Sequence, residues 1–258
     1  MKHCLAVIRI GAYIGVFGMF VVIGACGHIL FFMSQARLLK WIAFFAQWWA
    51  RVTCLIFNIQ IHIEGDANIK SGSLIVANHV GSPDIFILGA CFKGFFVSKA
   101  EIADWPLFNW LARLGRTIFA DRSKRHQVKA VIREIEERLN ADHSVILFPE
   151  AQATDGTDVV SFKSAVFEAA VLASRPVVPV TIRYHDGHRP TIAYYGDSFF
   201  EHTIRLLKTP RLQATVIVLP EISAGPNRQT LTEKSYRAIR DKVIQNTPQS
   251  ARSYLSFL

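Results

Sequence analysis

The chain of 258 residues has few cysteines, and they are far apart. Its four cysteines form neither a metal-binding spacing nor a disulfide pattern: Cys4, Cys26, Cys54 and Cys91. We therefore expect reduced cysteines that pack like small apolar residues, and no metal site. The sequence also lacks a Gly-x-Ser-x-Gly motif, so it has no nucleophile elbow of the hydrolase type.

Acidic residues are scarce relative to basic ones. Lys and Arg total 29 against 20 Asp and Glu, which gives a net charge of +9. Several of the cations lie between residues 113 and 129, so we expect anionic partners. The chain contains no zinc-finger spacing, RNA-binding aromatic block or basic zipper. We therefore predict no nucleic-acid partner and favour anionic lipid headgroups or phosphorylated substrates.

Apolar residues are concentrated near the N-terminus. The run from Ile10 to Met33 has no charged residue and is long enough to cross the hydrocarbon of a bilayer. A cleaved signal peptide is the alternative, because Ile23–Cys26 resembles a lipobox. Arg9 interrupts the start of the run, and the run continues beyond the possible cleavage point. Both features favour a retained membrane segment.

A second stretch, from Leu38 to Phe57, mixes aromatic side chains with Arg37, Lys40 and Arg51, a composition typical of the membrane interface. We predict that residues 1–58 form a pair of membrane-inserted or interfacial helices. The alternative is a buried helical hairpin of a soluble protein. Basic residues flank both ends of the first stretch, so charge does not distinguish a span from a re-entrant hairpin.

From residue 59 onward, short β-branched runs alternate with helical patterns. Strands are predicted at 59–63, 74–77, 95–97, 117–120, 145–148, 177–182, 191–195 and 215–219. Helices are predicted at 128–139, 164–173 and 230–245. We predict an α/β domain over 59–258 with a mixed, largely parallel sheet flanked by helices. The sites of such domains collect where strands end and helices begin.

The segment Asn78–Asp84 places a histidine ahead of an aspartate where a strand is predicted to pass into a helix. Histidine can act as a general base near neutral pH, and a carboxylate can orient its ring. Ser82 and Pro83 suit the cap and the first position of the helix. We therefore predict His79 as the base and Asp84 as its orienting partner. A satisfied structural histidine is the alternative.

Three further segments follow in order: Gly115–Arg122 (Gly-Arg-Thr-Ile-Phe-Ala-Asp-Arg), Phe148–Glu150 (Phe-Pro-Glu) and Val177–Val180 (Val-Val-Pro-Val). With Asn78–Asp84, they resemble the four sequence blocks of the glycerolipid acyltransferases typified by 1-acyl-sn-glycerol-3-phosphate acyltransferase. The resemblance covers roughly residues 55 to 220. It implies that Arg122 holds the phosphate of the acceptor. It also implies that Glu150 binds the glycerol part of the acceptor or supports the site through hydrogen bonds.

The third block departs from the family pattern, which continues Gly-Thr or Gly-Ser after the glutamate. Here Ala151 and Gln152 stand at those positions. Loss of glycine removes easy access to positive φ and adds a methyl group near the acceptor. We interpret the change as a difference in acceptor choice or loop shape rather than as loss of activity.

The resemblance implies a membrane-bound O-acyltransferase that moves a fatty acyl group to lysophosphatidic acid and forms phosphatidic acid. The donor would be acyl-CoA or acyl-ACP (the acyl carrier protein), as a co-substrate, with no bound cofactor. We expect the protein at the bacterial inner membrane, with the catalytic domain facing the cytoplasm. Alternatives are another lysolipid acceptor (lyso-ornithine lipid or a lysophospholipid), a lipid thioesterase or hydrolase, and a non-catalytic lipid-binding protein.

Overall fold

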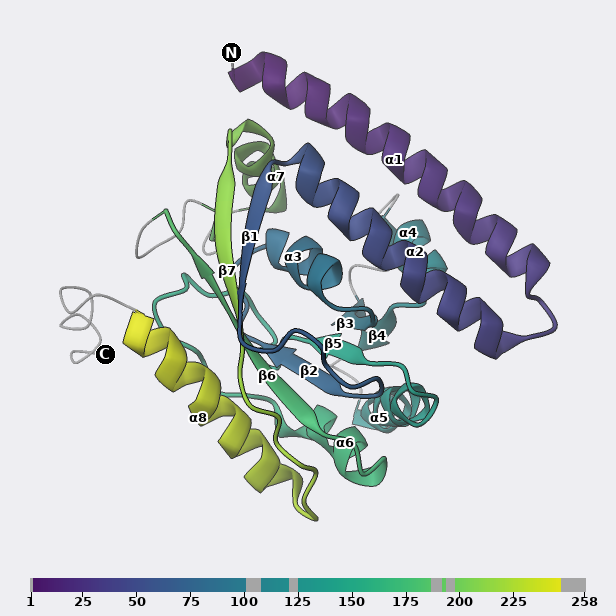
Figure 1. Ribbon diagram of the computed structural model, residues 1–258, viewed down its shortest axis with the longest axis vertical. Helices are drawn as coiled ribbons and strands as arrows, with labels where there is room; N and C mark the ends of the chain where they lie inside the picture. Colours follow the sequence, from purple (N-terminus) through teal and green to yellow (C-terminus); the bar gives the residue numbers. More distant parts are fainter. Residues whose placement is uncertain (1, 101–107, 121–124, 187–191, 194–197, 247–258) are drawn as a thin grey trace.

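The computed structural model describes residues 2–100, 108–120, 125–186, 192–193 and 198–246 (Figure 1). Strands and helices alternate along most of the chain after an N-terminal pair of helices. The strands are β1 Ile59–Glu64, β2 Leu74–Ala77, β3 Phe95–Lys99, β4 Ile118–Ala120, β5 Val145–Leu147, β6 Val177–Tyr184 and β7 Leu212–Val218. The helices are α1 Lys2–Leu30, α2 Gln35–Ile56, α3 Pro83–Cys91, α4 Phe108–Leu114, α5 Arg125–Asn140, α6 Glu168–Leu172, α7 Phe199–Lys208 and α8 Arg228–Asn246.

The strands form one seven-stranded sheet in the order β1-β7-β6-β2-β5-β3-β4. All neighbouring strands are parallel except β6 and β7, which are antiparallel. The prediction of a mixed, largely parallel sheet is therefore confirmed. The two central strands, β2 and β5, are buried along their whole length, as their continuous runs of apolar residues require.

Helices cover both faces of the sheet (Figure 1). One apolar core forms between the sheet and the side that carries α2, α3 and α7, and a second forms between the sheet and α5, α6 and α8. The stripe of α5 that faces this second core contains Val131, Ile135 and Leu139, all buried. This is the spacing of one helical face, and it was the basis for the predicted helix.

The predicted elements agree with the structure to within a few residues, with two differences. The predicted helix at 164–173 is a short 3₁₀ turn, Ser164–Phe167, followed by α6. Of the predicted strand at 191–195, the structure describes only Ile192 and Ala193, and neither lies in a strand.

Helices α1 and α2 form an antiparallel pair along one side of the molecule (Figure 1). The pair is closely packed at Gly27, where an added Cβ would lie 2.5 Å from the ring of Trp41. The indole of Trp41 also donates a hydrogen bond to the carbonyl of Ile23. The pair rests directly on the α/β domain, since α2 packs on α3, and α1 contacts α7 and α4.

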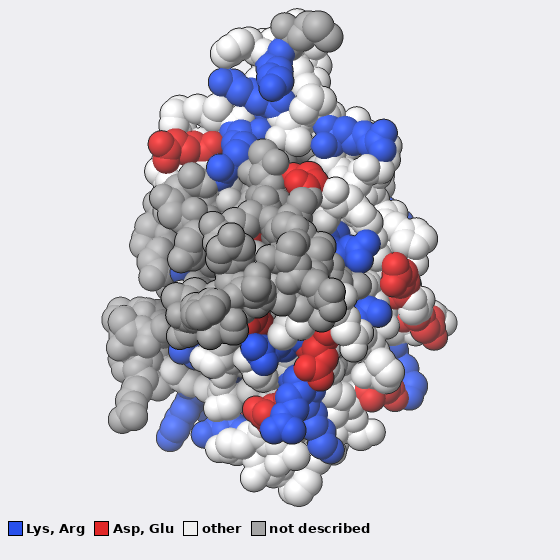
Figure 2. All heavy atoms as spheres, turned by 90° about the vertical axis from the view of Figure 1, so that its left-hand side faces the viewer, with Lys and Arg blue, Asp and Glu red and all other residues white. Residues whose placement is uncertain are grey.

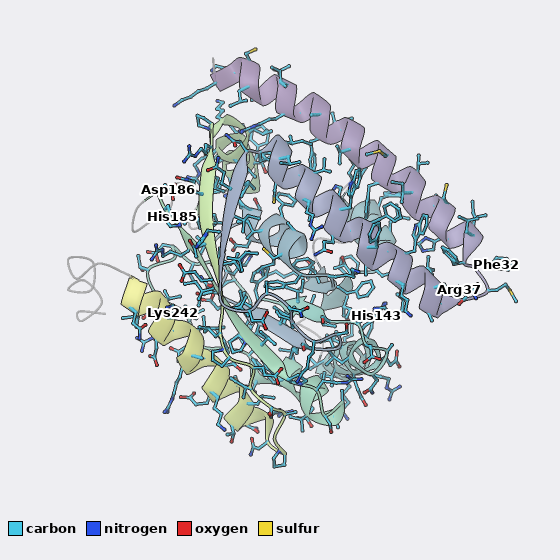
Figure 3. The ribbon with its side chains drawn as sticks, viewed as in Figure 1. Phe32, Arg37, His143, His185, Asp186 and Lys242 are labelled. Carbon is cyan, nitrogen blue, oxygen red and sulfur yellow. The ribbon has the colours of Figure 1, made fainter. Side chains whose placement is uncertain are left out.

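The outer face of α1 is apolar and exposed. α1 is long and apolar enough to cross a membrane, and only 11% of its most apolar window is buried. Phe32 and Met33, at the turn between the helices, are 71% and 83% exposed, and Phe32 projects outward beside Arg37 (Figure 3). Large apolar side chains in such numbers need a nonaqueous environment, and a lipid bilayer is one.

Asn78 extends the pairing of β2 and β6 beyond the end of β2. Its side chain donates to the carbonyl of Ile182 and accepts from the amide of the same residue, at 3.1 and 2.8 Å. The buried amide side chain thus occupies the place of another backbone unit and fixes the chain just before His79.

We predict that Asn78→Ala lowers the free energy of unfolding by about 2 kcal/mol, because it leaves a buried N–H and a buried C=O unpaired. Thermal or denaturant unfolding in detergent measures the change. Asn68→Ala, at an exposed position, is the matched control and should shift stability by less than about 0.5 kcal/mol. Equal effects of the two substitutions would contradict this role of Asn78.

Candidate active site

The functional candidates lie at the carboxyl ends of three adjacent parallel strands. His79 follows β2, Glu150 follows β5, and Tyr184 ends β6. Since β2 lies between β5 and β6, these three residues lie next to one another at the carboxyl ends of the strands. This is where ligand sites form in open α/β sheets.

Asp84, in the first turn of α3, is completely buried and accepts hydrogen bonds from four donors. Its Oδ2 atom accepts from Nδ1 of His79 at 2.8 Å and from the amides of Val80 and Gly81 at 2.6 and 3.0 Å. Its Oδ1 atom accepts from the hydroxyl of Tyr184. The Val80–Gly81 bend thus returns His79 over Asp84, as the spacing predicted. A buried carboxylate needs this many donors to offset its desolvation.

Tyr184 is a member of this network that the sequence did not indicate. Burial, reinforced by the charge of Asp84, raises the pKa of its hydroxyl well above the ordinary value. The hydroxyl therefore remains protonated and serves as a donor to the carboxylate. Only the pairing of β6 with β2 brings residue 184 to residue 84, so no local motif could reveal it.

The ring of His79 stacks on Phe148, with ring centroids 4.1 Å apart and an angle of 16° between planes. With Nδ1 bound to Asp84, Nε2 is the nitrogen that can take a proton from a substrate. The side chain is 21% exposed, so the ring is accessible at its edge. This is the geometry of a general base held in one tautomer by a carboxylate.

Glu150 is 2% exposed and lies behind His79 rather than on the surface. Its carboxyl oxygens accept from the amide of His79 at 2.7 Å and from the amide of Val160 at 3.0 Å. Burial raises the pKa of this carboxyl to about 8, while the two backbone amides act in the opposite direction. Both contacts of Glu150 are with backbone amides, so this geometry favours the role in which Glu150 supports the site through hydrogen bonds. Direct contact of Glu150 with an acceptor stays a prediction.

Ala151 has φ +69°, in the region that glycine adopts most easily. An alanine thus takes a left-handed conformation at the position where the family block has glycine. The loop that follows closes back on the site, where the amide of Thr154 donates to the carbonyl of His79 at 2.9 Å. Replacement of the glycine thus leaves the architecture around His79 in place.

Ser82 occupies the cap position of α3, but its side chain makes no capping hydrogen bond. Ser82 and Pro83 therefore take the predicted cap and first positions of the helix, without a side-chain capping bond. The hydroxyl of Ser82 instead lies 2.6 Å from Nε2 of His202, a buried residue of α7. Nothing in the local sequence of either residue indicates this pair, because 120 positions separate them.

Arg122, predicted to hold a phosphate, lies outside the described residues. Its role stays a prediction. Within the part of the chain that the structure describes, no group of three or more metal-ligating side chains is found.

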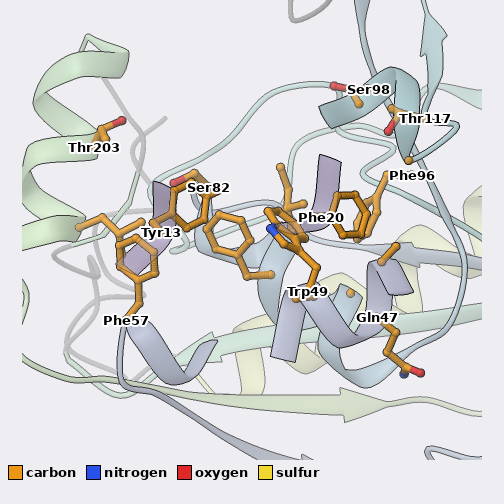
Figure 4. A pocket seen from close by; sticks show the side chains of 18 of the residues that line it. Tyr13, Phe20, Gln47, Trp49, Phe57, Ser82, Phe96, Ser98, Thr117 and Thr203 are labelled. Carbon is orange, nitrogen blue, oxygen red and sulfur yellow. The ribbon is translucent and has the colours of Figure 1, made fainter. Parts of the chain in front are cut away.

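Next to this site is an apolar cavity of about 440 Å³ (Figure 4). It lies between α1, α2, α3 and α7 and extends to β3 and the start of β4. His79 and Asp84 are not part of its wall, but Ser82 and Ile85, on either side of Asp84 in the chain, are, so the cavity borders the start of the helix that carries Asp84. Five aromatic side chains labelled in Figure 4 line the cavity: Tyr13, Phe20, Trp49, Phe57 and Phe96.

A partly exposed histidine bound to a buried carboxylate, beside an apolar cavity, on an α/β sheet with an apolar helical pair, suits a lipid-modifying acyltransferase. The Acyltransferase family model matches residues 58–183. The crystal structure of the 1-acyl-sn-glycerophosphate acyltransferase PlsC from Thermotoga maritima has the same fold. The superposition covers 99% of this chain and 98% of the Thermotoga maritima chain, with a TM-score of 0.65 and 19% sequence identity.

Two curated relatives are similar over most of their length. The lyso-ornithine lipid O-acyltransferase of Rhodobacter capsulatus is 33% identical over 76% of this chain and 75% of that protein. The 1-acyl-sn-glycerol-3-phosphate acyltransferase of Neisseria meningitidis is 29% identical over 68% of this chain and 71% of that protein. The chain belongs to the glycerolipid acyltransferase family and is an O-acyltransferase of lysolipids.

We predict that His79→Ala reduces acyl transfer by about 10²- to 10⁴-fold while the fold stays intact, because a general base contributes a factor of this size. Initial rates with a labelled donor, alongside circular dichroism, provide the measurement. His62→Ala, on an exposed part of β1, is the control and should retain activity. Undiminished turnover by the His79 variant would refute the assignment of the base.

We predict that Ala151→Gly raises the free energy of unfolding by about 1 kcal/mol. Relief of the left-handed conformation exceeds the entropic cost of glycine. Ala153→Gly in the same loop, which has no positive φ to relieve, should instead lower stability. Denaturant unfolding compares the two variants. A loss of stability in both would show that residue 151 is not strained.

Proposed function

We propose that this protein transfers a fatty acyl group from acyl-CoA or acyl-ACP to the free hydroxyl of lysophosphatidic acid, giving phosphatidic acid. The observation that carries this proposal is the His79–Asp84 pair, bonded at 2.8 Å beside an apolar cavity of acyl-chain character. The acyl carrier acts as a co-substrate, and no bound cofactor takes part.

In this mechanism Nε2 of His79 removes the proton of the acceptor hydroxyl as the oxygen attacks the thioester carbon. Asp84 stabilises the imidazolium that forms. When the tetrahedral intermediate collapses, the thiolate of the donor leaves and takes the proton from His79. No covalent enzyme intermediate is needed, because the acceptor attacks the thioester directly.

The cavity suits the acyl chain, because its wall is almost entirely hydrocarbon and aromatic. Burial of methylene groups there contributes about 0.8 kcal/mol each. Its few polar side chains are Gln47, Ser82, Ser98, Thr117 and Thr203, besides Tyr13 (Figure 4). An acyl chain held along this cavity places its thioester near Ser82 and therefore near His79.

Lyso-ornithine lipid is the second candidate acceptor. The relatives that bear this name, from Rhodobacter capsulatus and Pseudomonas aeruginosa, are 33% and 31% identical to this chain, above the 29% of the Neisseria lysophosphatidate enzyme. Ala151 and Gln152, next to Glu150, also depart from the phosphatidate-type block. Both observations concern the headgroup of the acceptor, which is the part in which lysophosphatidic acid and lyso-ornithine lipid differ.

We propose a location at the bacterial inner membrane, with the catalytic edge facing the cytoplasm, where acyl-CoA and acyl-ACP are available. The exposed apolar face of α1 and the turn at Phe32 support contact with lipid. Lys and Arg side chains cover more of the face shown in Figure 2 than acidic ones, in keeping with the net charge of +9. Such a surface is attracted to anionic headgroups.

The test is transfer from labelled acyl-CoA and acyl-ACP to a panel of lysophosphatidic acid, lyso-ornithine lipid and lysophospholipids. We expect His79-dependent product with lysophosphatidic acid. A kcat/KM about tenfold higher with lyso-ornithine lipid than with lysophosphatidic acid would identify lyso-ornithine lipid as the acceptor. Release of free fatty acid with no acceptor requirement would identify a thioesterase and refute both.

We predict that Ala46→Trp, which fills part of the cavity from α2, shifts the donor preference toward shorter acyl chains. The expected loss is about tenfold for the longest accepted donor, because a rigid apolar pocket discriminates methylene groups by such factors. Leu55→Trp, on the same helix at a position 78% exposed, is the control and should leave the preference unchanged. The kcat/KM values for a donor series provide the measurement.

A further inference from the structure

Arg9 is a charged residue within the apolar helix α1, and it is only 3% exposed. A guanidinium in an apolar environment is costly unless its donors are satisfied. Other groups must therefore accept hydrogen bonds from Arg9, and in the structure these acceptors all lie outside α1.

The guanidinium donates to six backbone carbonyls at distances of 2.5 to 3.5 Å. Two of the carbonyls end α2 and four lie at the end of α7: Ile56, Phe57, Leu206, Leu207, Thr209 and Pro210. The last carbonyls of a helix lack partners within the helix and carry the negative end of its dipole. One cation thus closes two helix ends at once.

The same contacts lie against one end of the apolar cavity. Ile10, Tyr13 and Ile14 of α1 are part of its wall, beginning at the residue after Arg9. Phe57 and Leu207, whose carbonyls bind Arg9, also line it. Figure 4 shows Tyr13 and Phe57 together at this end, with α7 and Thr203 beside them.

We propose that Arg9 is a positioning residue that holds α1 in place as a wall of the acyl cavity and thereby sets acyl-chain selectivity. The inference rests on the function proposed above. In lipid, apolar contacts alone give a helix little preference for protein over acyl tails, because both are hydrocarbon. The six hydrogen bonds of Arg9 fix the position of α1 relative to α2 and α7, which the apolar face of α1 cannot do.

The test compares Arg9→Met and Arg9→Lys with the unaltered protein, using kcat/KM for donors that differ by two methylene groups. We expect the unaltered protein to discriminate by about tenfold or more, as a rigid pocket does. Arg9→Met should reduce that ratio to about threefold or less. Arg9→Lys, which keeps the charge but has fewer donors, should give an intermediate ratio.

Arg51→Met is the matched control, because Arg51 also donates to the last turn of a helix, at the carbonyl of Ala90, but does not line the cavity. It should leave the ratio unchanged. An Arg9 variant that loses activity equally for all donors would overturn the proposal and leave Arg9 a structural residue only. If Arg9→Met fails to fold, Arg9→Lys decides by the same ratio.

A binding readout separates this proposal from the proposed function. Fluorescent fatty acids of different lengths are titrated into the full-length protein in detergent, without donor or acceptor. Loss of length dependence in Arg9→Met supports the role of Arg9 even if the unaltered protein transfers no acyl group. Unchanged length dependence overturns it, whatever the enzyme assay shows.

Discussion

The buried carboxylate of Asp84 organises the site. It accepts from the ring of His79, from the two amides of the bend between them and from Tyr184. These donors come from the segment between β2 and α3 and from the end of β6. The carboxylate therefore fixes the tautomer of the base and, at the same time, joins the helix to the central strands. A loss of charge at this position would disturb both.

Around that carboxylate, the third sequence block serves as a support. Glu150 accepts a hydrogen bond from the backbone amide of His79, and Phe148 stacks on the imidazole ring. The backbone amide of Thr154 donates to the carbonyl of His79. The left-handed Ala151 shows that this turn is required by its surroundings, since alanine adopts it at a cost. An alanine at the position of the usual glycine therefore affects backbone strain and leaves these contacts of His79 in place.

The N-terminal helices pack on the α/β domain and share a cavity with it. α1 and α2 supply walls of the cavity that begins beside Ser82, and Arg9 ties α1 to the ends of α2 and α7. Ile10 and Ile14 of α1 line this cavity and are also 44% and 63% exposed, so the apolar surface of α1 is continuous with the wall of the cavity.

Sequence patterns alone determined the strands of the sheet, the apolar N-terminal pair and the pairing of His79 with Asp84. These depend on local periodicity and on a spacing of a few residues. The partnerships of Tyr184 with Asp84, of His202 with Ser82 and of Arg9 with two helix ends were decided only by the tertiary structure. Each joins positions 47 to 201 residues apart whose neighbours carry no shared motif. Hydrogen bonds between such positions follow from which strands pair and which helix ends meet, and that is a property of the whole fold.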